Sequence, residues 1–255
     1  MASQPIYQFY AELDDFAPLI WRRFQVAGNI TMAQLGYIVM TMFEMQAGHL
    51  YALEILPDEE LSENMRELRE LAADGGKSGG NVLDVMPQCD KISRYEMPNM
   101  ESFLSDDDRY LVFDSTKHKL SQTTLRPKGR LNFNYDFGDD WWILLALESV
   151  TVDKALPGRD LPRVLEGGGY GIVDDCGGTS GLTELVQAFK KKKGKAYLEF
   201  SEWLERDSFD ITAFDMDDMN FRLKKIPRIY ADIYERHVGP TDRAIALLER
   251  KYLKK

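Results

Sequence analysis

Cysteine and histidine are scarce in this sequence. Its 255 residues include two cysteines, Cys89 and Cys176, and three histidines. The cysteines are far apart and form no CxxC pair, so the sequence predicts neither a disulfide framework nor a zinc site built from thiolates. We expect two reduced thiols, because a free cysteine commonly behaves as a small buried apolar residue. Ser180 lies one residue short of a GxSxG motif, and with so few histidines a hydrolase triad has no support.

Positive charge is also in deficit. There are 42 acidic and 32 basic residues, which gives a formal net charge of −10. Direct nonspecific binding to nucleic acid or anionic lipid is therefore not expected, and a phosphate ligand would need a local basic patch or a metal. The first residues lack the pattern of a signal peptide, and no apolar run is long enough to cross a bilayer. We expect a cytoplasmic protein without a membrane partner.

The motifs of common nucleotide-binding sites are missing as well. The tripeptide Asp136, Phe137, Gly138 matches part of a kinase signature, but no glycine-rich loop, strand lysine motif or catalytic loop precedes it. The glycines of residues 167–171 do not form GxGxxG, and GxxxxGK[ST] does not occur. These absences remove the usual nucleotide-dependent enzyme classes.

What is present predicts a globular α+β protein. Hydrophobic residues make up 44% of the chain and aromatic residues 11%, which is enough apolar surface to fold. Alternating patterns over residues 6–13 and 130–137 are typical of half-buried strands. Residues 19–26 and 50–56 are further strand candidates, and residues 141–152 complete a hairpin whose apolar run indicates a central strand.

Helices are predicted from caps and apolar spacing. Thr31 and Gln34 form a capping box before a helical apolar pattern. The chain after about residue 181 is mostly helical, with Lys190–Lys193 at one helix C-terminus, where cations complement the helix dipole. Further helices are expected over residues 196–206, 215–226 and 241–255. Together these patterns predict an antiparallel or mixed sheet, formed by the N-terminal strands and the hairpin, packed against helices, with a helical C-terminal part.

The expected domain organisation is a single domain, 1–255, with an insert. Residues 57–109 are acidic and glycine-rich, which indicates an exposed helix and loops inserted into a core of residues 6–56 and 110–226. Residues 227–255 form a C-terminal helical extension of this core. Residues 156–181 are expected to be a loop.

Five short motifs occur in an order that resembles the plasmid pRiA4b ORF-3-like family. They are P-x-I-W-R-R at 18–23, His-Leu at 49–50, Y-D-F-G-D-x-W at 135–141, P-R-x-L-E-G at 162–167 with D-D-x-G-G at 174–178, and Asn-x-x-Leu at 220–223. The resemblance implies an accessory role linked to plasmids or transposable elements, and the family has no established activity. Ile143 stands where the family commonly has histidine, which argues against a metal site that relies on that histidine. Val164 and Gly171 replace the family's loop cysteines, which argues against a metal site of thiolates.

The candidate site gathers polar residues of these motifs. The ligand-binding candidates are Trp21, Arg22, Arg23, His49, Tyr135, Asp136, Asp139, Trp141, Asp174 and Asp175. Among them, Asp136, Asp139, Asp175 and His49 are candidate ligands for a divalent cation (Mg, Mn or Ca), since such cations favour oxygen ligands. The structural alternative is that the aspartates accept backbone amide hydrogen bonds in turns and pair with Arg22 or Arg23. The two arginines lie on opposite faces of a strand.

Two functional hypotheses remain open from the sequence. The first is a non-catalytic binding or accessory protein that engages a protein or a small-molecule ligand. The alternative is a divalent-metal-dependent hydrolase acting on a phosphate ester, in which His49 handles a proton. Catalytic residues cannot be named from the sequence, and the two hypotheses differ in whether the carboxylates hold a metal.

Overall fold

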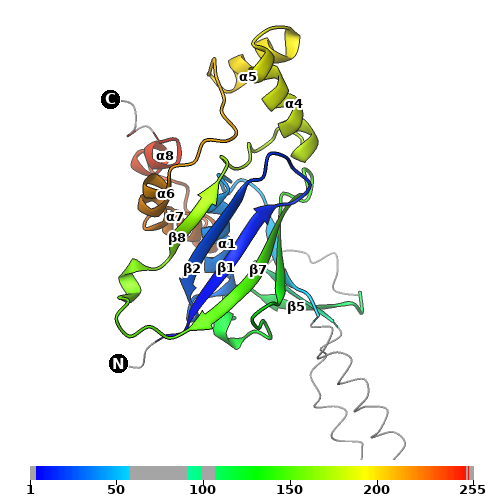
Figure 1. The fold of residues 1–255 in the computed structure, drawn as a ribbon. Coiled ribbons are helices and arrows are strands. Elements are labelled where there is room, and N and C mark those ends of the chain that lie inside the picture. Colours follow the sequence, from blue (N-terminus) through cyan, green and yellow to red (C-terminus); the bar gives the residue numbers. More distant parts are fainter. Residues whose placement is uncertain (1–3, 58–90, 99–106, 251, 253–255) are drawn as a thin grey trace, which may run out of the picture.

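The computed structural model describes residues 4–57, 91–98, 107–250 and 252 (Figure 1). Most of the predicted insert, including its expected helix and Cys89, lies outside the described residues. Within them the chain forms one mixed sheet of eight strands and six α-helices. The predicted α+β fold, with helices in the C-terminal part, is confirmed.

The sheet has the strand order β5-β4-β3-β6-β7-β1-β2-β8. The strands are β1 (Ile6–Leu13), β2 (Trp21–Ala27), β3 (Tyr51–Ile55), β4 (Ile92–Glu96), β5 (Tyr110–Asp114), β6 (Arg130–Tyr135), β7 (Trp141–Thr151) and β8 (Arg163–Gly168). All neighbours are antiparallel except β4 and β5, which are parallel. The predicted hairpin is the pair β6 and β7, and β7 lies centrally between β6 and β1.

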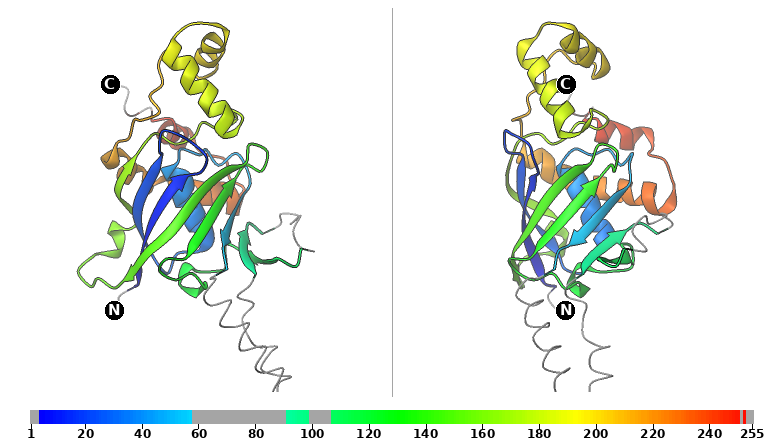
Figure 2. Two further views of the ribbon diagram at one scale, coloured as in Figure 1. Left: turned by 45° about the vertical axis from the view of Figure 1, so that its right-hand side comes forward. Right: turned by 90° about the vertical axis from the view of Figure 1, so that its right-hand side faces the viewer.

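Helices cover one face of the sheet. They are α1 (Met32–Met42), α4 (Gly178–Lys191), α5 (Lys195–Trp203), α6 (Met216–Leu223), α7 (Ile226–Arg236) and α8 (Asp242–Leu248). Figures 1 and 2 show α1, α6 and α7 behind the sheet, while α4 and α5 project beyond one end of it. The opposite face of β1, β2, β7 and β8 carries no helix in these views. Among the described residues, no helix is long and apolar enough to cross a membrane.

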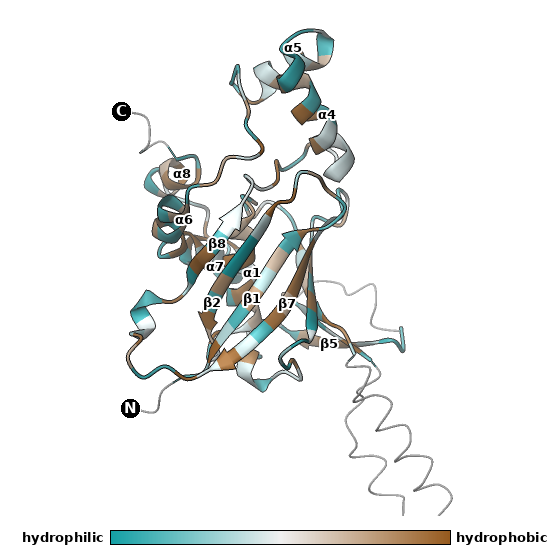
Figure 3. Ribbon diagram, viewed as in Figure 1, coloured by the Kyte–Doolittle hydropathy of each residue, from teal (hydrophilic) through white to brown (hydrophobic). Residues whose placement is uncertain are grey.

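The strand pattern explains which face is covered. Along β1, Tyr7, Phe9, Ala11 and Leu13 are buried and the residues between them are not fully buried, apart from Ile6 at the strand's start. Figure 3 shows hydrophilic and hydrophobic residues mixed along β1, β2 and β7, as expected for strands with one face on the core.

Helix α1 is the central element of the helical layer. Its start is fixed by the predicted capping box, because Gln34 N donates to Thr31 Oγ1 (3.1 Å) and Thr31 N donates to Gln34 Oε1 (3.0 Å). Ten of its eleven residues are buried, since it packs on the sheet and on α6 and α7. Gly36 allows this approach, because a Cβ there would lie 2.5 Å from the ring of Tyr51. A larger residue at position 36 would push α1 off the sheet.

Three elements differ from the sequence predictions. The predicted loop 156–181 contains strand β8, whose short, glycine-ending sequence RVLEGG gives little apolar alternation. The predicted insert contains β4, a strand of the main sheet whose Arg94 pairs with Glu54 and Glu96. Strand β5 lies where no strand was predicted. Helix α7, in contrast, coincides with the start of the predicted helical extension 227–255, and its N-terminal proline is typical of a helix start. The division into a core, an insert and a C-terminal extension stays a prediction.

Candidate functional site

The ten candidate residues occupy different parts of the fold. Trp21 and Arg23 lie on the helix-free face of the sheet, whereas Arg22, Tyr135, Trp141 and Asp174 are buried. His49, Asp136 and Asp175 meet where the loop after α1, the β6–β7 turn and the loop after β8 come together. Asp139 lies in the same turn as Asp136 but makes a separate contact. The structure therefore forms one polar loop cluster from three of the ten residues.

The helix-free face carries Trp21 and Arg23. Trp21 stacks on Tyr10, with ring centroids 5.6 Å apart. Arg23 pairs with Glu148 (3.0 Å) and with Glu166. The predicted pairing of this arginine with an aspartate is wrong, because the acidic side chains within its reach are Glu166 on the neighbouring strand β8 and Glu148 on β7, one strand further away. Exposed pairs of this kind contribute only about 0–1 kcal/mol to stability.

Arg22 points to the opposite face and is fully buried. Its guanidinium donates to five backbone carbonyls, those of Trp21 (2.7 Å), Met42 (3.1 Å), Gly168 (2.7 Å), Gly169 (2.8 Å) and Tyr170 (2.9 Å). The predicted aspartate partner is wrong here too. Burial lowers the pKa of Arg22 to about 9, so the side chain is still charged at neutral pH. Arg22 thus ties the end of α1 to the chain that leaves β8.

The loop cluster consists of His49, Asp136 and Asp175. The ring of His49 lies between the two carboxylates, with Nδ1 3.5 Å from Asp136 Oδ2 and Nε2 3.1 Å from Asp175 Oδ1. One ligand atom from each residue can be chosen so that all three lie within 4.8 Å of one another. The side chain of Asp175 is 70% exposed and that of Asp136 is 13% exposed. The cluster therefore opens to solvent on the Asp175 side.

Hydrogen bonds hold each segment of the loop cluster in place. Asp136 N donates to Leu50 O (2.9 Å), and Asp136 Oδ1 accepts from Gly138 N (3.1 Å), which leaves Oδ2 facing His49. The hydroxyl of Tyr234 on α7 donates to the carbonyl of His49. The imidazole of His49 also packs edge to face with the ring of Tyr135, and the two ring centroids are 5.7 Å apart. Hydrogen bonds thus fix the backbone positions from which Asp136 and His49 meet.

Asp174 lies beneath the loop cluster. It is 9% exposed, and its Oδ2 accepts from Gln46 N (2.9 Å) and from the Tyr135 hydroxyl (3.2 Å). Its Oδ1 is buried and has no hydrogen-bond partner among the described residues. Burial raises the pKa of Asp174 to about 6, against lowering contributions from the Gln46 amide, Tyr135 and His49. A carboxylate in this state is a proton acceptor near neutral pH.

The raised pKa predicts a pH dependence for stability. Because the folded-state pKa lies above the unfolded value of 3.8, the folded protein holds this proton over a window from about pH 4 to pH 6. Stability contributed by Asp174 is complete below that window and is lost as the pH rises through it. We expect Asp174→Asn to match the parent protein near pH 4 and to exceed it by about 2–3 kcal/mol near pH 7.

Urea unfolding of both proteins at several pH values would measure this difference. The acidic end of the window serves as an internal control, since both side chains are uncharged there and share the same shape. A difference between the two proteins that does not change with pH would contradict the assigned role of burial.

Asp139 makes the contact that joins the β6–β7 turn to the loop after β8. Its Oδ2 accepts from Gly177 N (3.0 Å), the backbone-amide contact expected for a turn aspartate. Gly178 has a φ of +69°, and a Cβ there would lie 2.6 Å from Asp139 O. Both the positive φ and the close approach require glycine. Asp139 therefore holds the loop and lies outside the His49, Asp136 and Asp175 set.

Comparison with known protein families gives a match over most of the chain, including the loop cluster. The sequence model described as "Plasmid pRiA4b ORF-3-like protein" matches residues 5–218. The chain belongs to the plasmid pRiA4b ORF-3-like family. No curated protein matches the sequence. The match spans every residue of the loop cluster and ends within α6.

A solved structure has the same fold. It is the crystal structure of a protein of unknown function, MM3350, from Methanosarcina mazei Go1, with a TM-score of 0.61 and 22% identity. The similarity covers 85% of this chain and 98% of the other. At this identity the likeness supports the architecture of the pRiA4b ORF-3-like chain and says nothing about a reaction.

Several family motifs have structural roles that sequence reasoning missed. Asn220 donates through Nδ2 to Val164 O (3.1 Å), and its Oδ1 accepts from Val164 N (2.8 Å). The side chain thereby satisfies part of the free edge of β8, as a neighbouring strand would. Trp141 is fully buried in the core, and its Nε1 has no partner among the described residues. The Asn-x-x-Leu motif marks Asn220, but its partner β8 lies in the segment 156–181 that the sequence predicts to be a loop.

Proposed function

We propose that this protein is a binding protein whose loop cluster holds a divalent cation. The observation that carries the proposal is the convergence of one nitrogen and two oxygen donors, from His49, Asp136 and Asp175, within 4.8 Å of one another. Two ligands of one cation lie at most twice the bond length apart, roughly 4–5 Å for bonds of about 2.0–2.6 Å. The donors are therefore close enough to share one ion.

The donor set favours one of the candidate cations. Magnesium and calcium prefer sites made of oxygen ligands, whereas an imidazole beside carboxylates also suits manganese and zinc. Of the three cations expected from the sequence, manganese fits this mixed set best. The two carboxylates that flank His49 match the charge of a divalent ion, and its binding would replace their contacts with the imidazole.

An ion with three protein ligands keeps coordination positions for a further molecule. These open coordination positions would face solvent on the exposed side of the loop cluster, at Asp175. A bound cation would give this acidic chain, with its net charge of −10, a local positive centre for a carboxylate or phosphate group. The proposed ligand is therefore an anionic group of a protein or of a small molecule.

Manganese titration tests the proposal. We expect calorimetry on the full chain to show one site for Mn²⁺, weakened at least about tenfold by His49→Ala or by Asp175→Asn, since each removes a direct ligand. Asp175→Asn is suited to this test because its exposed side chain contributes little to the core. Thermal melting would verify that both variants remain folded.

Asp139→Asn is the matched control. It makes the same chemical change in the same loop region, but its carboxylate contacts Gly177 N and not the loop cluster. It should bind Mn²⁺ as the parent protein does. Absence of Mn²⁺ binding by the parent protein, or equal losses in Asp139→Asn and Asp175→Asn, would reject the cation site.

Asp174 favours a second candidate function, a metal-dependent phosphate ester hydrolase. A buried carboxylate with a pKa raised to about 6 beside a metal site could accept a proton from a metal-bound water. Hydrolysis of p-nitrophenyl phosphate with Mn²⁺ present would distinguish the two functions. Activity that Asp174→Asn abolishes while Mn²⁺ still binds would establish the hydrolase, whereas Mn²⁺ binding without activity on any phosphate ester tested would favour the binding protein.

The location and biological setting are part of the proposal. A role in the cytoplasm, accessory to plasmids or transposable elements, rests on composition and on the family resemblance. Such a role does not require this acidic chain to contact nucleic acid directly.

A further inference from the structure

Helices α4 and α5 form a projecting arm that ends in an exposed helix. The two helices pack through Phe189 and Tyr197, whose ring centroids are 5.7 Å apart. No residue of α5 is buried, although the structure describes all nine of them. Leu198 is 64% exposed and Trp203 is 46% exposed. The two side chains are five residues apart, which places them on different sides of the helix. Leu198 is therefore the exposed apolar side chain of the face that also carries Lys195 and Glu202.

The two ends of α5 carry opposite charge. Lys190, Lys191, Lys192, Lys193 and Lys195 are all exposed and lie at the α4–α5 turn, where α5 begins. Exposed Glu202, Glu205 and Asp207 lie where it ends, with Arg206 among them. The lysine end is therefore strongly positive and the carboxylate end is negative, on a chain whose net charge is −10.

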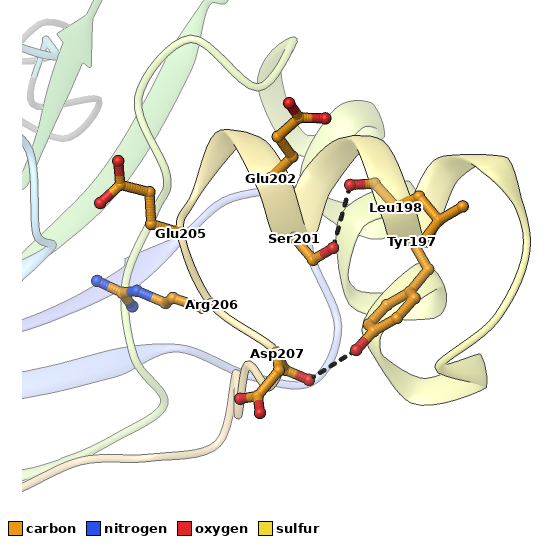
Figure 4. A pocket seen from close by; sticks show the side chains of 7 residues that line it. All are labelled: Tyr197, Leu198, Ser201, Glu202, Glu205, Arg206 and Asp207. Carbon is orange, nitrogen blue, oxygen red and sulfur yellow. Dashed lines mark hydrogen bonds between the residues drawn. The ribbon is translucent and has the colours of Figure 1, made fainter.

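A shallow hollow follows the outer side of α5 towards its carboxylate end (Figure 4). Tyr197, Leu198 and Glu202 line it from the helix, and Glu205 and Asp207 line it from the segment that follows. The hydroxyl of Tyr197 donates to Asp207 O (3.1 Å), which holds that segment against the helix. The hollow thus joins apolar and acidic side chains and is complementary to a partner that offers lysines beside an apolar residue.

A second copy of α5 offers that combination. In a two-fold symmetric pair the same surface meets itself, and the two α5 helices can run parallel or antiparallel. The opposite charges at the two ends of α5 favour the antiparallel arrangement. The start of each helix would then face the end of the other. Leu198 would be covered near the centre, and each lysine end would meet the partner's carboxylate end. We infer that the protein forms a homodimer through antiparallel pairing of α5.

The size of the surface sets the expected affinity. Stable interfaces usually bury about 1,200–2,000 Å² in total, and a pair of nine-residue helices buries less. The dimer should therefore be weak and concentration-dependent, with a dissociation constant of roughly micromolar or above. Sedimentation equilibrium of the full chain over a wide concentration range would measure it.

Charge reversal gives the decisive test. One variant, with Lys191→Glu, Lys193→Glu and Lys195→Glu, has net negative charge at both ends, because only two of the five lysines remain. Another, Glu202→Lys with Glu205→Lys, has net positive charge at both ends. Each alone should dimerise at least about tenfold more weakly than the parent, because like charges meet across the pair. An equimolar mixture of the two variants should recover a dimer, since every end then faces an opposite charge.

Recovery on mixing is the result that misfolding or general charge effects cannot produce. A parent protein that stays monomeric at all concentrations would overturn the inference. Variants that dimerise as well as the parent, or a mixture that shows no recovery, would also overturn it, because each means that α5 does not pair with its own copy. All five substituted residues are exposed, and thermal melting would verify the folding of each variant.

Discussion

Arg22→Met should lower the free energy of unfolding by at least about 3 kcal/mol, because the substitution leaves buried carbonyls without their donor. Five carbonyl oxygens from β2, the end of α1 and the chain after β8 accept from this one guanidinium. The guanidinium also lies over the ring of Phe214, 4.2 Å from its centroid. Methionine fills much of the same volume, so the loss reports hydrogen bonds and charge more than a cavity.

The neighbouring arginine supplies a matched control. Arg23→Met removes the same group from the opposite face of β2, where its partners Glu148 and Glu166 are exposed. Its effect should stay within about 1 kcal/mol. Urea unfolding of both variants would measure the contrast, and equal effects would mean that the backbone contacts of Arg22 contribute little.

Glu44→Gln should be the second strongly destabilising change, by about 3 kcal/mol, because it removes the charge that two arginines share. The Glu44 carboxylate accepts from Arg222 (2.6 Å) and from Arg250 (2.7 Å), and the side chains of Glu44 and Arg222 are 6% and 3% exposed. Arg250 also donates to Asp218 (2.8 Å). The network ties the end of α1 to α6 and to Arg250, which lies just after the end of α8.

A double variant isolates the pair. Glu44→Gln combined with Arg222→Met should be less destabilised than the sum of the two single changes, because Arg222 is then no longer left buried beside an uncharged partner. Glu148→Gln, at an exposed pair, is the control and should cost no more than about 1 kcal/mol. Additive effects in the double variant would show that Glu44 and Arg222 stabilise the fold independently.

The sequence predicts the parts of this fold whose apolar pattern is local. Strand β1, helix α1 with its capping box, and the β6–β7 hairpin each carry their own periodicity and caps. Strand β4 does not, because its buried face includes Arg94 and is balanced by Glu54 from another strand. Strand β8 is an edge strand, and the side chain of Asn220 hydrogen-bonds to its free edge at Val164. Such elements are defined by tertiary contacts that a local pattern cannot contain.

The same limit applies to the loop cluster. Turn chemistry marks Asp136, Asp139 and Asp175 as polar positions in glycine-containing loops, but it does not say which of them face His49. The hairpin geometry turns Asp136 towards His49 and leaves Asp139 on Gly177 N. The sequence likewise places Arg22 and Arg23 on opposite faces, while the identity of their partners depends on β7, β8 and the chain around them.

The loop cluster is assembled from three segments that lie far apart along the chain. An unfolded chain would have to bring these segments together against loop-closure entropy, so it would hold an ion much more weakly than the folded protein does. A cation at His49, Asp136 and Asp175 would therefore act as a ligand of the native state and raise the melting temperature in proportion to the logarithm of its free concentration. In a cell, the supply of that metal would then influence how much of this protein persists, in addition to what it can bind.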